Sequence, residues 1–75
     1  MIHAMLVLST RENVQNLVGE FDTYGDAYAW AITKVVDAGH KILSATNAPT
    51  RGGGSCLTFW RANDTGAAAR LFHNE

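Results

Sequence analysis

Two stretches of the chain have the composition of β-strands: Ile2–Leu8 is a short apolar run interrupted only by His3, and Ser55–Asn63 combines apolar and aromatic residues with Thr58. A period of two places successive side chains on opposite faces of a β-strand. The two stretches are therefore predicted to be the first and fourth strands of a sheet. On both strands one face is strongly apolar and the other is semi-apolar. The semi-apolar face carries His3, Met5, Val7, Cys56, Thr58 and Trp60.

The middle of the chain has the spacing of a helix instead. Apolar residues in Ala27–Ala38 recur at i, i+3, i+4 and i+7, which forms one apolar stripe on a helix. The Thr23 hydroxyl can accept a hydrogen bond from the backbone N–H of Asp26, as an N-cap does. Gly39 stands where a helix often ends in the left-handed conformation. A capped helix of about three to four turns is predicted here. Its stripe consists of Tyr28, Ala31, Ile32 and Val35.

The segments on either side of this helix are predicted to be the second and third strands, Asn16–Asp22 and Lys41–Ala48. The second strand has a competing interpretation, because apolar residues in the 11–21 segment also have helical spacing and Ser9–Glu12 could form a capping box. Gly19 weakens a helix, and another capped helix starts directly after Asp22. A hairpin with the first strand is therefore the preferred interpretation.

The C-terminal residues 66–74, GAAARLFHN, are alanine-rich and follow Asp64 and Thr65, either of which can cap a helix. A short C-terminal helix is predicted there. The fold class that results is α+β, with the order ββαββα in a single domain, 1–75. We expect a two-layer sandwich of a small, mainly antiparallel sheet, one central helix and the short C-terminal helix.

Composition narrows the function classes. The chain has 75 residues, of which 47% are hydrophobic and 17% charged, with a net charge of −1. This composition is typical of a folded globular protein. The near-neutral net charge does not indicate the basic surface that binds nucleic acid or anionic lipid. The single cysteine suits a reducing compartment, and the apolar N-terminal run is too short to cross a bilayer. We expect a cytoplasmic protein that binds no membrane, with nucleic acid disfavoured as a partner.

Candidate catalytic and metal-binding residues lack the necessary spacing. Three histidines and Cys56 match none of the short paired spacings of zinc sites. Cys56, Ser44, Ser55 and Thr58 could act as nucleophiles, but no nucleophile elbow or clustered acid/base pair accompanies them. The sequence therefore predicts no metal, no cofactor and no enzymatic activity.

A glycine-rich loop, Arg51-Gly52-Gly53-Gly54, precedes the fourth strand. Successive backbone N–H groups beside an arginine can hold an anion. Phosphate loops, however, lead into a helix and carry a lysine, whereas this loop leads into a strand. The preferred interpretation is that the glycines make the loop of a hairpin flexible. A small-ligand or anion-binding homo-oligomer that uses this loop is the alternative function.

The aromatic residues favour a protein partner. At 100° per residue, Trp30 lies about 200° from Tyr28, on the side of the helix that carries Lys34 and Asp37. It is either an exposed interface anchor or a residue covered by the core or the C-terminal helix. Trp60 and Met5 lie on the semi-apolar sheet face, which one central helix cannot cover. The predicted partner-binding residues are Trp30, Trp60, Met5, Lys34 and Asp37, and the partner is another protein or a second copy in a homodimer.

The segment GEFDTYGDAYAWAITKVVDAGHKILSA, residues 19–45, resembles the strand–helix–strand centre of small phage and mobile-element proteins, including anti-CRISPR and other anti-defence proteins. The resemblance is architectural and covers part of the chain. It implies a non-catalytic inhibitor that occupies a site on a host defence complex. A small protein-binding module of this kind is the leading functional hypothesis. A nucleic-acid binder that uses Lys34, Lys41, Arg51 and Arg61 beside Trp60 is the least favoured.

Overall fold

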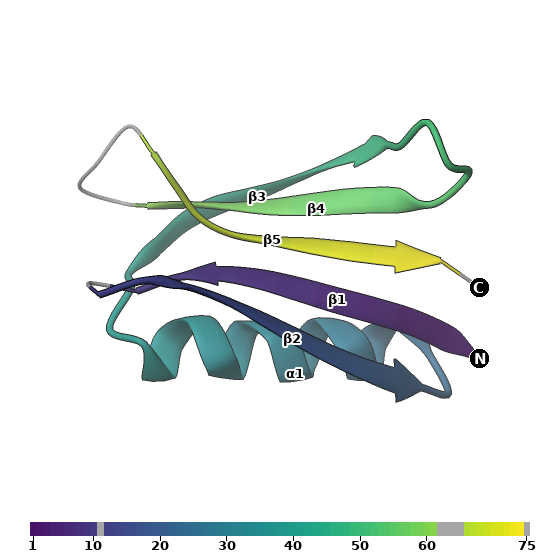
Figure 1. Ribbon diagram of the computed structural model, residues 1–75, viewed down its shortest axis with the longest axis horizontal. Helices are drawn as coiled ribbons and strands as arrows, with labels where there is room; N and C mark the ends of the chain where they lie inside the picture. Colours follow the sequence, from purple (N-terminus) through teal and green to yellow (C-terminus); the bar gives the residue numbers. More distant parts are fainter. Residues whose placement is uncertain (11, 62–65, 75) are drawn as a thin grey trace.

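The computed structural model describes residues 1–10, 12–61 and 66–74. Within them the chain forms one antiparallel sheet with a helix on one face (Figure 1). The elements are β1 (Ile2–Ser9), β2 (Val14–Phe21), α1 (Tyr24–Asp37), β3 (Ile42–Pro49), β4 (Ser55–Arg61) and β5 (Ala67–Asn74).

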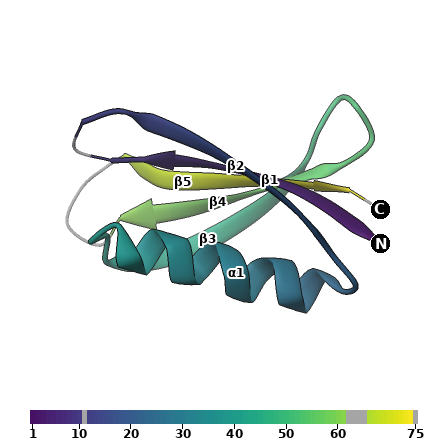
Figure 2. The same ribbon diagram turned by 60° about the horizontal axis from the view of Figure 1, so that its bottom comes forward.

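The strand order across the sheet is β2-β1-β5-β4-β3. β5 is the central strand and pairs with β1 on one side and β4 on the other. β2 and β3 are the edges, and α1 connects them by crossing one face of the sheet. Figure 2 shows α1 on one side of the twisted sheet and the β3–β4 loop rising on the other side. We call the face without a helix the open face.

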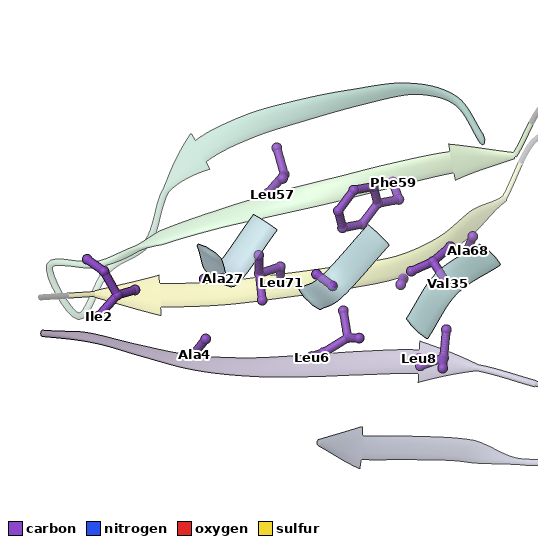
Figure 3. Packing of buried hydrophobic residues seen from close by; sticks show 12 residues of the cluster. Ile2, Ala4, Leu6, Leu8, Ala27, Val35, Leu57, Phe59, Ala68 and Leu71 are labelled. Carbon is purple, nitrogen blue, oxygen red and sulfur yellow. The ribbon is translucent and has the colours of Figure 1, made fainter. Parts of the chain in front are cut away.

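The core lies between α1 and the sheet. Alternate residues of β1 and β4 point into it, together with Ala68, Ala69 and Leu71 of β5. Figure 3 shows the buried side chains gathered around those of the helix. Phe59, Leu6, Leu71 and Val35 are the largest fully buried side chains. The helix buries Ala27, Ala31 and Val35 as a narrow ridge against the sheet. Because two of these three residues are alanines, the helix can approach the sheet closely.

Both predicted ends of the helix are confirmed. The Thr23 side chain accepts a hydrogen bond from the backbone N–H of Asp26 at 3.2 Å. Gly39 has a φ of 92°, the left-handed conformation that a residue without a Cβ adopts readily. His40, just beyond this stop, contacts the backbone oxygen of Ser9 through its Nε2 atom at 2.6 Å. This contact links the residue that follows the helix to the last residue of β1.

The predicted ββαββα order with a second, C-terminal helix is wrong. Residues 67–74 form β5, so the order is ββαβββ and the sheet has five strands. Helix propensity is a weak prior that tertiary contacts often override. In this chain β5 gains hydrogen-bonded ladders on both sides, and its buried Ala68 and Ala69 leave room for α1. The predicted caps Asp64 and Thr65 lie outside the described residues.

The other uncertain segment is a strand, as preferred. β2 pairs with β1 from Ile2↔Phe21 to Ser9↔Val14, so the helical interpretation of that segment is not realised. Gly19 lies on the core face of β2, opposite Ala4. A Cβ on Gly19 would stand 2.9 Å from the Phe21 ring, which shows how closely this part of the edge strand is packed.

Candidate functional site

The open face carries a continuous row of apolar side chains, one from each strand. Met5 pairs with Val18 on one side and Phe72 on the other, Phe72 pairs with Cys56, and Cys56 pairs with Ala48. All five side chains point away from the helix, because they alternate with core residues or with the partners of core residues. We call this set the apolar row: Val18, Met5, Phe72, Cys56 and Ala48.

The apolar row is accessible to solvent. Val18 is 76% exposed and Met5 38% exposed, while Phe72 and Cys56 are half-buried. Isolated exposed apolar residues are common on protein surfaces, but contiguous apolar patches often mark interaction sites. Here the residues are contiguous through the pairing of all five strands. The row therefore meets the description of an interaction surface.

Polar residues flank the apolar row on both sides. On one side the register aligns four polar residues, Asn16, Arg70, Thr58 and Thr46, together with the apolar Val7 of β1. Arg70 is exposed on the central strand and forms no side-chain hydrogen bond or ion pair with the described residues. On the other side Glu20, His3 and Asn74 are aligned. The His3 Nδ1 and Glu20 Oε1 atoms are 3.4 Å apart, which makes an ion pair only when the imidazole is protonated.

A pocket of about 460 Å³ opens at this second side. The β3–β4 loop, which rises from the sheet (Figure 2), forms one wall of it. We call this pocket the corner pocket. Residues of the apolar row form part of its lining, and the loop contributes Thr50, Gly52 and Gly54. Its volume lies within the range of about 300–1,000 Å³ that is usual for ligand pockets. The residues that the sheet contributes include His3, Met5, Val18, Glu20, Phe72 and Asn74.

The charge of the corner pocket favours a cation. Glu20 is the one acidic residue among the described residues that line it, and no lysine or arginine is among them. Arg51, the arginine of the predicted anion site, is exposed and does not line the pocket. Anion binding by Arg51, Gly52, Gly53 and Gly54 stays a prediction, and the nearby carboxylate opposes it.

The glycines of the loop have separate structural requirements. The loop closes through hydrogen bonds from Thr50 N to Gly54 O at 2.9 Å and from Gly53 N to Thr50 O at 3.3 Å. Gly53 has a φ of 92°, which disfavours any residue with a Cβ. A Cβ on Gly54 would stand 2.7 Å from the backbone oxygen of His73. Turn geometry thus explains the glycine at position 53 and close packing the glycine at position 54, whereas a Cβ on Gly52 would meet nothing within 4 Å.

The five predicted partner-binding residues do not form one surface. Met5 and Trp60 lie on the open face, and the Trp60 Nε1–H donates to the Thr46 hydroxyl at 2.9 Å. Lys34 and Asp37 are exposed on α1, on the opposite side of the molecule. Trp30 is half-buried between α1 and β2, with its ring centroid 5.1 Å from that of Phe21. Of the two interpretations of Trp30, the structure thus favours a residue covered by other side chains over an exposed interface anchor. The covering side chain is Phe21 of β2.

An aromatic and polar cluster on the helix side was not expected from the sequence. The Tyr24 and His73 rings lie 4.7 Å apart, and the His73 Nε2 atom is 3.4 Å from the Asn47 Oδ1 atom. Partial burial lowers the pKa of His73, and burial followed by the nearby Tyr28 raises the pKa of Tyr24. The sequence carried no local signal for this cluster, because His73 lies on the core face only once residues 67–74 pair with β1 as a strand.

The described residues contain no group of three or more His, Cys, Asp and Glu side chains that could hold a metal ion. Cys56 is a free cysteine within the apolar row. In the same part of the chain, no helix is long and apolar enough to cross a bilayer.

Comparison with known proteins adds no relative. No family model, curated protein or solved structure matches this chain. The features of this chain that bear on its function are therefore the open face and the corner pocket.

Proposed function

We propose that this chain is a small, non-catalytic protein-binding module that works through the open face of its sheet. The observation that carries the proposal is the apolar row, which crosses all five strands on the side without a helix. Polar residues border the row on both sides, and interfaces commonly have this arrangement of an apolar centre and a polar rim. A phage-type inhibitor of a host defence complex is one protein of this class, and that finer assignment stays a prediction.

The size of the open face supports a protein partner. Five strands at about 4.8 Å spacing and about 27 Å in length give roughly 650 Å² in projection. A standard interface buries about 800 Å² on each partner. The projected face of this sheet and an equal area of a partner would together bury about 1,300 Å², within the range of about 1,200–2,000 Å² for specific interfaces. A partner that covers the sheet from edge to edge would therefore form an interface of ordinary size.

Photo-crosslinking tests this proposal with a matched control. A photoreactive residue replaces Val18 on the open face in one variant and Val36, on the outer side of α1, in another. Both valines are exposed, at 76% and 56%. After irradiation in an extract of cells that express the chain, we expect protein adducts from position 18 and few from position 36. Equal yields at the two positions, or no adduct at position 18, would contradict the proposal.

A further inference from the structure

We infer that the partner of the open face is a second copy of this chain, docked face to face about a two-fold axis that runs along the apolar row. This inference rests on the proposed function. Homodimers with a two-fold axis are the commonest oligomers, and they require a surface patch that complements itself. The apolar row meets this requirement, since an axis along the row places each of its residues against the row of the other copy.

Charge selects this axis over its alternative. β5 is the central strand, with Arg70 two residues before Phe72 and Asn74 two residues after it. An axis along the row exchanges the two sides of the row, so Arg70 of one copy stands over the Asn74 side of the other. An axis along the strands would instead bring the two Arg70 side chains together, and like charges in contact are repulsive.

The Asn74 side of the row is the site of the corner pocket. An incoming Arg70 therefore meets the pocket whose acidic residue is Glu20. Glu20 lies on β2, two strands from β5, a lateral distance of about 10 Å. The two long side chains can bridge this distance together. Phe72 in the lining offers an aromatic ring, against which a guanidinium group also packs well.

The symmetry produces this contact twice. Arg70 of each copy enters the corner pocket of the other copy. Each Arg70 is thereby paired with the Glu20 of the other copy. The net charge of −1 per chain adds little repulsion between copies. Two sheets that pack face to face leave about 10 Å between them, which is room for the side chains of both apolar rows.

Sedimentation equilibrium of two charge-reversal variants tests the pairing. Arg70→Glu and Glu20→Arg should each weaken self-association at least about tenfold, because each creates two like-charge contacts in the homodimer. An equimolar mixture of the two variants should form a heterodimer with near-parental affinity, since both cross-contacts then join opposite charges. Lys34→Glu, on the exposed side of α1, is the control and should leave the dissociation constant unchanged.

Three results would overturn the inference: a parent that stays monomeric at millimolar concentration, a mixture that associates no better than its components, or an equal loss in Lys34→Glu. Circular dichroism and a thermal unfolding curve of each single variant confirm that it is folded before association is measured. If the parent is monomeric while position 18 crosslinks to a different protein, the proposed function survives and the second copy is excluded as the partner.

Discussion

Gly19→Ala is a substitution whose cost can be worked out from the structure. The added Cβ would stand 2.9 Å from the Phe21 Cε2 atom and 3.0 Å from its Cζ atom. An aromatic ring can often rotate away from such a contact. Here the Phe21 ring packs on Trp30, with their centroids 5.1 Å apart, so a movement of one ring disturbs the other. The substitution should therefore strain the contact between α1 and the β2 edge.

Two opposing effects set the magnitude. Overpacking typically costs about 1–3 kcal/mol. Replacing glycine in a strand interior recovers about 0.5–1 kcal/mol of backbone entropy. We therefore expect Gly19→Ala to lower the free energy of unfolding by about 0.5–2 kcal/mol, with a fall in Tm of about 4–8 °C for each kcal/mol. Urea denaturation and thermal melting measure the two quantities.

A control and a second background make this prediction specific. A Cβ on Gly52 meets nothing within 4 Å, so Gly52→Ala should leave stability unchanged or raise it by a few tenths of a kcal/mol. In a Phe21→Leu background, where the ring is absent, Gly19→Ala should cost less than about 0.5 kcal/mol. Parental stability of Gly19→Ala in the unaltered chain would refute the reasoning.

Three further predictions concern the helix and the Tyr24–His73 cluster. Gly39→Val should destabilise by about 1–2 kcal/mol in chemical denaturation, the cost of a Cβ in the left-handed conformation, and an unchanged midpoint would contradict this. Trp30→Ala should cost about 1–3 kcal/mol, between a surface change and a core tryptophan, because its ring is half-buried on Phe21. Burial lowers the folded-state pKa of His73 below its ordinary 6.5, so the unfolded chain binds the proton more readily. The free energy of unfolding should therefore fall as pH drops through 6.5 toward the folded-state pKa, and His73→Gln should remove that part of the pH dependence.

Elements with a complete local signal could be predicted from the sequence. The helix had a side-chain N-cap, an apolar stripe and a glycine at its end. Each of these features depends only on residues a few positions apart in the chain. β1 was a short apolar run, and β4 had the aromatic and Thr content that is typical of strands. In contrast, residues 67–74 begin with three alanines, which favour a helix, and show no alternation that would indicate a strand. Their place between β1 and β4 decided the outcome, and that pairing joins residues far apart in the sequence.

The candidate site could be predicted only in part for the same reason. Alternation indicated that Met5 and Trp60 face away from the core. The apolar row, however, depends on β5 pairing with both β1 and β4. The predicted C-terminal helix would form neither pairing, so the row could not be derived from it. For Trp30 the 100° step gave its angle from Tyr28, but the width of the sheet did not follow from the sequence. The sheet extends far enough beyond the alanine ridge for Phe21 to cover Trp30.

The most direct test of the central claim is whether the open face is covered in solution. Methyl NMR with a soluble paramagnetic agent reports the solvent exposure of single side chains. In the isolated chain Val18 is more exposed than Val36, at 76% against 56%. If a second copy covers the open face, the Val18 methyl signals of the purified protein at high concentration should broaden less than those of Val36, and dilution should reverse that order. Stronger broadening of Val18 than of Val36 at every concentration would contradict the account.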